Sequence, residues 1–135
     1  MLIKEIAQYL HARSIGVFDE VGSSGDIYLG ILPDTPDRVI SIFQRGGQEA
    51  DPRNEYRTVL VQVITRSFDK HDGMNLGQSV IDVLSGFHGE LIPGGTHIID
   101  CIAMQSAPVD IGNDAKGRYE WSVNLTIEYK SEKEG

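Results

Sequence analysis

The chain has 135 residues, of which 40% are hydrophobic, a formal net charge of −8 and a single cysteine. A chain of this length forms one domain whose core needs no disulfide bond, and one cysteine cannot form such a bond internally. Nucleic-acid backbones and anionic membranes attract basic surfaces, so the acidic charge argues against free binding to either, and the short apolar runs argue against a membrane-spanning helix.

The first predicted element is a helix over residues 2–13. Its apolar side chains, including Leu2, Ile6 and Leu10, recur at the spacing of one helical face, with polar and charged residues between them. Gly16 lies just beyond the last turn, where a helix commonly ends. The pattern therefore predicts an amphipathic helix that packs one side on a core.

Three strands are predicted in the first half of the chain, at residues 27–32, 39–43 and 58–65. Pro33 and Pro36 separate the first two, because proline lacks the N–H group that the interior of a sheet requires. The third strand carries apolar side chains on both of its faces. We therefore expect both faces of this strand to be at least partly covered.

A second helix is predicted over residues 69–87, where apolar side chains again follow helical spacing. Gly73 and Gly77 fall in its first turns, and glycine is a weak helix former. We therefore expect the regular part of this helix to begin near Met74 or Asn75.

Two further strands are predicted at residues 97–105 and 119–129, and the second alternates apolar and polar side chains throughout. Cys101 has apolar neighbours in the first of them, which predicts a buried thiol in a protein of a reducing compartment. Residues 44–54 and 106–118 are polar and rich in turn-forming residues, so both are expected to be long loops.

The order of these elements is helix, strands, helix, strands. This order favours an α+β fold in which two α-helices pack on a mostly antiparallel β-sheet. We expect a single α+β domain over residues 1–130, followed by a disordered charged tail at residues 131–135.

The four histidines are candidates for metal binding or acid–base chemistry. His11 lies on the polar side of the first helix, His71 in a turn, His88 after the second helix and His97 at the start of a strand. No two of them have the i, i+4 spacing of a helical metal site. The favoured interpretation is four surface histidines.

Two pairs of aspartates are the other candidates for chemistry. Asp34 and Asp37 flank Pro36, and Asp110 and Asp114 lie in a second polar loop. Paired carboxylates serve as general acid and base or bind a divalent cation, so a small metal-dependent hydrolase that uses one of these aspartates with a histidine is one alternative. Aspartate also stabilises turns, and no GxSxG nucleophile motif is present. We favour turn formation and predict no catalytic residue, no metal, no cofactor and no enzymatic activity.

Three segments of the chain together resemble a known family. Residues 30–37 read GILPDTPD, residues 56–66 contain a Gln-Val-x-x-Arg pattern, and residues 107–124 read APVDIGNDAKGRYEWSVN. Their order and spacing resemble a small protein of long-tailed bacteriophages and prophages that is often labelled a minor capsid protein. The chain is similar in length and layout to the tail terminator, or tail-to-head joining, family, and the resemblance spans nearly the whole chain.

This resemblance implies an α+β virion structural protein that assembles as a hexameric ring at the head–tail junction. Such a ring caps the tail tube protein and then binds a head–tail connector or stopper protein, and DNA passes through its lumen without specific binding. It implies no catalytic residue, cofactor or membrane, and a location in the virion tail, with the host cytoplasm as the place of assembly. Another head–tail connector or a head-associated minor capsid protein stays open as an alternative.

Charged residues in and beside the loops are our candidates for contacts between subunits, because such pairs fix the register of an interface more than they add affinity. The acidic charge suits a channel through which DNA slides, since like charge repels phosphate, although ordinary solubility explains it equally well. The predicted subunit-interface residues are Asp34, Asp37, Arg38, Arg45, Arg57, Arg66, Asp110, Asp114 and Arg118.

Overall fold

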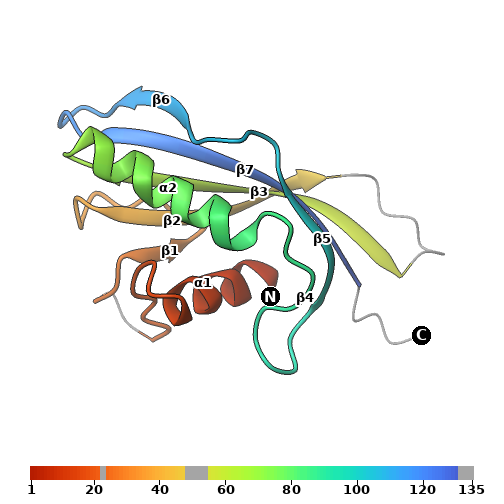
Figure 1. Ribbon diagram of the computed structural model, residues 1–135. Helices are drawn as coiled ribbons and strands as arrows, with labels where there is room; N and C mark the ends of the chain where they lie inside the picture. The colour runs from red at the N-terminus through yellow and green to blue at the C-terminus, as the bar shows by residue number, and fades with distance from the viewer. Residues whose placement is uncertain (22–23, 48–54, 131–135) are drawn as a thin grey trace.

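The computed structural model describes residues 1–21, 24–47 and 55–130, and over these residues it contains two helices and a seven-stranded, mostly antiparallel sheet (Figure 1). The predicted α+β fold is therefore confirmed. The elements in chain order are α1 (Leu2–Ala12), β1 (Ile27–Leu29), β2 (Val39–Gly47), β3 (Tyr56–Ser67), α2 (Lys70–Leu84), β4 (Gly89–Glu90), β5 (His97–Ala103), β6 (Val109–Asn113) and β7 (Tyr119–Lys130).

The sheet is built around β3 and β7, which pair along their whole length from Tyr56↔Lys130 to Ser67↔Tyr119. β2 lies on the other side of β3 and is followed at that edge by β1, which runs parallel to β2. β6 pairs with the first part of β7, and β5 pairs with its last part and carries β4 at the far edge. The two central strands, β3 and β7, therefore pair with other strands along both of their edges.

Both helices cover the same face of the sheet, as Figure 1 shows. Side chains alternate along a strand, so Val61 and Val63 of β3 and Leu125 and Ile127 of β7 all point to this face, where they are at most 1% exposed. They form one core with the apolar stripes of the two helices. The helical members of this core are Leu2, Ile6, Ala7 and Leu10 of α1 and Leu76, Val80, Ile81 and Leu84 of α2.

Helix α2 begins at Lys70 and not near Met74 or Asn75. Asp69 is the reason, because its Oδ1 accepts hydrogen bonds from the backbone N–H groups of His71 (2.9 Å) and Asp72 (3.3 Å). An N-cap of this kind satisfies donors that have no partner within the helix, and it offsets the weak helix propensity of the glycine that follows.

The two glycines of α2 lie where the helix approaches the sheet and its neighbouring loop most closely. A Cβ atom on Gly73 would lie 3.0 Å from Cδ1 of Trp121, and one on Gly77 would lie 2.8 Å from Cγ of Pro108 and 3.3 Å from Cγ2 of Val123. These residues therefore allow close packing, although the sequence alone indicated only that they weaken the helix.

Two predicted loops contain strand. β2 continues to Gly47 because β3 keeps pairing with it, so residues 44–47 are strand, whereas residues 48–54 lie outside the described residues. The expected loop at residues 106–118 contains β6, which pairs with the first part of β7 and so satisfies backbone groups that would otherwise lie at an edge. The expected disordered tail, residues 131–135, also lies outside the described residues.

We expect Gly77→Ala to destabilise the protein. The added methyl group would overlap the ring of Pro108, and overpacking of this kind costs about 1–3 kcal/mol, which exceeds the gain of about 1 kcal/mol in helix propensity. Urea unfolding followed by circular dichroism measures the change. Asn75→Ala, at an exposed position of the same helix, is the matched control and should be neutral or slightly stabilising. Equal stability of Gly77→Ala and wild type would contradict the packing role of Gly77.

Candidate functional site

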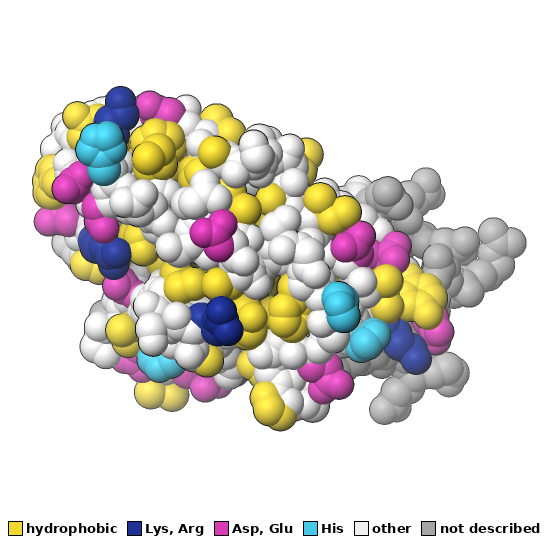
Figure 2. Space-filling model, viewed as in Figure 1, with side chains coloured by type: hydrophobic (Ala, Val, Ile, Leu, Met, Phe, Trp, Pro, Cys, Tyr) yellow, Lys and Arg dark blue, Asp and Glu magenta, His cyan; other side chains and the backbone are white. Residues whose placement is uncertain are grey.

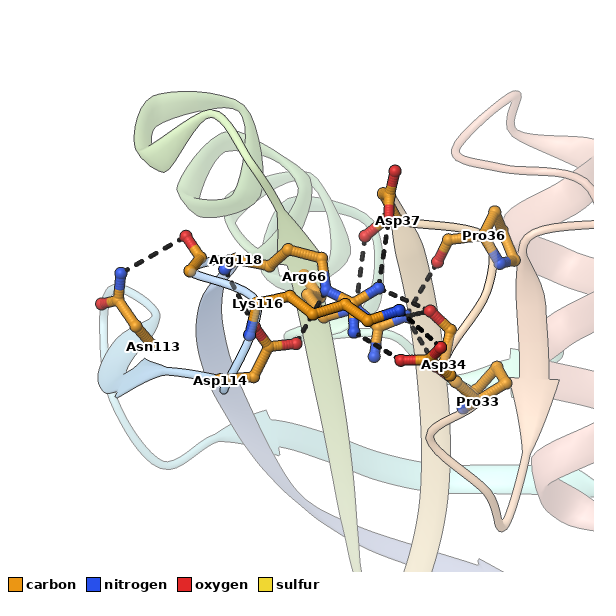
Figure 3. A network of polar contacts seen from close by, with 10 residues as sticks. Pro33, Asp34, Pro36, Asp37, Arg66, Asn113, Asp114, Lys116 and Arg118 are labelled. Carbon is orange, nitrogen blue, oxygen red and sulfur yellow. Dashed lines mark hydrogen bonds and ion pairs between the residues drawn. The ribbon is translucent and has the colours of Figure 1, made fainter.

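The most extensive polar network in the described part of the chain binds the segment between β1 and β2 to two arginines (Figure 3). We call residues 33–37 the proline corner. Arg66 comes from the end of β3, and Arg118 precedes β7, so the corner lies against the two central strands. Both arginines are only 2% exposed, which is unusual for this residue type unless it is fully paired.

Arg66 binds the backbone of the corner. Its Nη2 donates to the carbonyl oxygens of Pro33 (2.6 Å) and Pro36 (2.8 Å), and its Nε donates to that of Asp37 (3.2 Å). A segment outside regular secondary structure leaves carbonyl groups without ladder partners, and arginine carries five N–H donors in a fixed planar arrangement. One side chain therefore replaces the hydrogen bonds that a strand would have provided.

Arg118 binds the side chains of the corner. Its Nη2 contacts Oδ1 of Asp34 and its Nη1 contacts Oδ1 of Asp37, each at 3.1 Å, while its Nε donates to Oδ2 of Asp114 at 2.7 Å. Lys116 donates from Nζ to Oδ2 of Asp34 at 2.6 Å. Three carboxylates thus converge on one buried guanidinium, which neutralises part of their charge.

The network shifts the acidity of its members. The hydrogen bond from Lys116 is the largest influence on Asp34, and with Arg118 it lowers the pKa of that carboxyl despite some desolvation. Desolvation is the largest influence on Asp114 and raises its pKa, but hydrogen bonds from Arg118 and Lys116 outweigh it, so the pKa of Asp114 is lowered overall. Burial lowers the pKa of Arg66, and the nearby charge of Arg118 adds to this effect.

Arg118 and Glu120 are shifted in the opposite direction. Desolvation by itself lowers the pKa of Arg118, but its bonds to the three aspartates raise the pKa above the ordinary value. Burial, together with the charge of Asp114, raises the pKa of Glu120. The three aspartates therefore stabilise the charged form of Arg118, whereas burial disfavours the charged form of Glu120 even though Arg66 and Arg118 act in the opposite direction.

The structure brings Asp34, Asp37, Arg66, Asp114 and Arg118 together within one subunit. The sequence identified these residues as contacts between subunits, whereas their described bonds are internal to the chain. Whether any of them also contacts a neighbouring subunit stays a prediction. The side chains of Asp34 and Asp37 are accessible to such a neighbour, because they are 65% and 56% exposed.

The remaining predicted interface residues lie apart from the network. Arg38 binds Asp72 through Nε at 2.8 Å, and Arg57 donates to a backbone carbonyl beside it. Asp110 accepts a hydrogen bond from the N–H of Gly112 at 2.8 Å, which is the local turn bond that the sequence favoured. Arg45 lies on β2, where its Nε and Nη2 donate to Oε1 of Gln62 at 3.0 and 2.9 Å.

Lys116 is the member of the network that the sequence analysis missed. Its position between Asp114 and Arg118 was the one sequence signal that could have placed it in the network. These two residues close a tight turn, in which the N–H of Asp114 donates to the carbonyl of Arg118 (3.0 Å). Lys116 lies inside this turn, and its N–H donates to Oδ1 of Asp114 at 3.0 Å. Its partner, Asp34, is 82 residues away in the chain, so the sequence could not indicate it.

The arrangement does not favour metal chemistry. Arg118 occupies the position between the three carboxylates that a bound cation would need. Among the described residues no group of three or more His, Cys, Asp or Glu side chains is arranged to hold a metal ion.

Cys101 is buried in β5 as predicted, and burial, with the charge of Asp100, raises the pKa of its thiol to about 12. Within the described ranges, neither helix is long and apolar enough to cross a bilayer.

The fold and the network define a small acidic structural domain whose convergent charges bind its own corner. Comparison with known families is consistent with this class, since the family described as bacteriophage tail terminator protein matches residues 5–131. The chain belongs to this family and is therefore a structural protein of a phage tail. A search of curated proteins gave no match.

We expect Arg118→Met to lower the stability of the fold, because it removes the guanidinium that neutralises three carboxylates and leaves them facing one another. The midpoint of urea unfolding at neutral pH should fall clearly below that of wild type. Arg13→Met removes the same charge from the exposed end of α1 and should leave the midpoint nearly unchanged. If both substitutions have the same small effect, the network does not hold the corner.

The same network predicts acid sensitivity. The pKa values of Asp34 and Asp114 are lowered in the folded protein from those of an ordinary aspartate, so both carboxyls bind protons more weakly when folded than when unfolded. The stability that they contribute is therefore present above about pH 4 and is lost as the pH falls through their folded-state pKa values. Urea midpoints measured from pH 6 to pH 2.5 should fall at the acidic end, and less steeply for Arg118→Met. Equal slopes for the two proteins would show that Arg118 does not cause the shift.

Proposed function

We propose that this chain is the subunit of a ring, hexameric in the assembled tail, that ends the tail tube and joins the tail to the head. The observation that carries this proposal is the match to the tail terminator family over residues 5–131. The partners are further copies of the chain, the tail tube protein and the head–tail connector or stopper protein. The place of action is the virion at the head–tail junction, after assembly in the host cytoplasm.

The proline corner supports a role in contacts. The two arginines hold its backbone and side chains in one conformation, so its exposed carboxylates are presented without the entropy cost of ordering a loop on binding. We retain Asp34 and Asp37 as proposed subunit contacts, together with Arg38, Arg45, Arg57 and Asp110. Arg66, Asp114 and Arg118 support the corner from behind and are proposed to position it.

The net charge of −8 supports passage of DNA through the ring without specific binding. Phosphate is repelled by an acidic surface and retained by a basic one, so an acidic subunit lets the duplex slide. The convergent charges of the corner neutralise one another and leave no nucleophile beside a base. The proposed role is therefore structural, with no catalysis and no cofactor.

The test of this proposal is the position of the subunit in the particle. The chain carrying a small C-terminal tag, labelled with gold and viewed by negative-stain electron microscopy, should appear at the junction of head and tail, and tails assembled without the chain should fail to join heads. Label along the tail shaft, or none on the virion, would overturn the proposal.

A further inference from the structure

The sheet ends in two different edges, and exposed apolar side chains lie at both. β1 forms one edge and β6 the other, and in the described part of the chain neither has a strand on its outer side (Figure 1). Val109 and Ile111 of β6 are 40% and 46% exposed, and Val17, beside β1, is 50% exposed. Figure 2 shows the helix-bearing face between these edges, over which acidic, basic and histidine side chains are spread. Exposed apolar groups at a sheet edge are typical of a surface that another protein covers.

The two edges lie in the same cross-strand rows of the sheet. Strand register places Tyr28 of β1 in one row with Val109 of β6, and Ile27 in the next row with Asp110. The residues between them are Ser41, Ile64 and Ser122 in the first row and Ile40, Thr65 and Trp121 in the second. Because side chains alternate along a strand, the first row lies on the face opposite the helices and the second on the helix-bearing face.

A second copy that stands beside the first in the same orientation therefore brings its β1 edge to the β6 edge of the first, with matching rows and faces. β2, β3, β7 and β6 alternate in direction and β1 is parallel to β2, so β6 and the neighbouring β1 run antiparallel. Such a contact joins two different surfaces. Its repetition around an axis closes a ring, whereas a contact between two identical surfaces ends at a dimer.

The β1 edge contains a hollow that can receive side chains of β6. Its volume is about 650 Å³, and its lining includes Val17, Tyr28, Pro33 and Pro36. Tyr28 shares its row and its face with Val109 of the opposite edge. The hollow of one copy is therefore level with Val109 of a copy beside it, and its apolar groups suit that side chain.

The outer backbone of β1 is partly bonded already. The carbonyl oxygen of Val17 accepts hydrogen bonds from the N–H groups of Asp26 (2.9 Å) and Ile27 (3.1 Å). These bonds hold Val17 against the start of β1, at the row that ends in Asp110 on the other edge. A neighbouring β6 therefore packs on side chains at this point and does not extend the hydrogen-bonded ladder.

Each edge also has a charged side chain that makes no ion pair in the described part of the chain. At the β6 edge this is Asp110, whose Oδ1 accepts the N–H of Gly112. At the β1 edge it is Arg13, which ends α1 on the helix-bearing side and is joined to Val17 by a short turn. Asp110 lies in the row whose side chains face the helices, so the anion and the cation are on the same side of the sheet.

The other charged side chains near the two edges are bound within one copy. The ion pairs are Lys4 with Glu20, Arg38 with Asp26 and Asp72, Lys116 with Asp34, and Arg118 with Asp34, Asp37 and Asp114. Asp19 accepts a hydrogen bond from Oγ of Ser24 at 2.6 Å. Glu128, with its neighbours Asp100 and Lys130, is about 20 Å from Ser122 along β7, which is too far to take part.

We propose that the β6 edge of one copy packs against the β1 edge of the next around the ring. Val109 enters the hollow, Ile111 packs against Val17, and Asp110 meets Arg13. Pairing of two β6 edges is disfavoured, because it places Asp110 beside its own counterpart. The proposal rests on the proposed function, because it assigns the contact between neighbouring subunits of that ring.

The size of this contact sets its expected strength. β6 has five residues and is therefore about 17 Å long, which is short for an interface that needs about 800 Å² per partner to be stable. Free copies should associate weakly, and the tail tube and the connector add contacts in the assembled particle. A covalent trap is the suitable way to detect the contact between free copies.

The test is a pair of cysteines, one at each edge of the full-length chain. A chain with both Val17→Cys and Ile111→Cys, treated at high concentration with a short bifunctional maleimide, should give a ladder of covalent oligomers that extends to the hexamer. Each single variant should stay monomeric, because a head-to-tail contact never brings two identical edges together. The wild-type chain is the control for the native Cys101, which is buried.

A charge exchange in the double-cysteine chain tests the ion pair. Arg13→Glu and Asp110→Arg should each lower the rate of cross-linking by at least about tenfold, because like charges then meet across the contact. The combination of the two should restore the rate. Lys70→Glu and Asp82→Arg make the same charge changes at exposed positions of α2 and should leave the rate unchanged.

Four outcomes overturn the interface: no ladder from the double-cysteine chain, a ladder that stops at the dimer, dimers from a single-cysteine variant, or charge variants that cross-link at the unchanged rate. Circular dichroism on each variant separates loss of contact from loss of folding. The position of the labelled wild-type chain in the virion tests the proposed function separately. Label at the junction without a ladder rejects only the interface, and a ladder with label elsewhere rejects only the function.

Discussion

The pairing of β3 with β7 is the constraint on which the rest of the structure depends. Each strand has 12 residues, and they pair without a register shift. Because side chains alternate along a strand, a slip of one residue would move the core valines to the opposite face. The same register places Arg66 opposite Glu120 and next to the turn that carries Arg118. The helices and the proline corner both take their positions from this one ladder.

The proline corner illustrates how a polar motif resembles a reactive site without being one. Asp34 and Asp37 are spaced like paired carboxylates, but both bind the guanidinium of Arg118. The carbonyl groups between them bind Arg66. Two buried charges of the same sign so close together are tolerated because backbone oxygens and three carboxylates surround them. The motif therefore maintains a shape, and its exposed carboxylate edges remain accessible to a neighbour.

A subunit that is built for assembly must leave part of its surface incomplete. Here the helices cover one face of the sheet and the proline corner covers one end of the other, whereas Ile102 and Met104 are 53% and 56% exposed. Among the described residues, Arg38 and Arg118 bind carboxylates, Arg66 binds backbone carbonyls and Arg45 binds the amide oxygen of Gln62.

Much of the fold was predictable from the sequence. The apolar spacing of α1, the alternation of β7 and the order of helices and strands predicted the α+β class correctly, because these patterns depend on near neighbours. The start of α2 at Lys70 was less clear, since the glycines that weaken the helix also permit contact with Trp121 and Pro108. β6 was missed because its five residues carry turn formers and become a strand only beside β7.

By itself the sequence determined both helices and most of the strands, the fold class, the acidic charge and the family resemblance, because each is expressed in local spacing, composition or motif order. Only the tertiary structure decided which charged residues bind one another. Arg118 and Asp34 are 84 residues apart, and Arg66 and Pro33 are 33 apart, so their contacts exist only after the sheet has formed. Hydrogen bonds and ion pairs act over a few ångströms in space and leave no mark on spacing along the chain, which is why residues predicted to join subunits were found holding one subunit together.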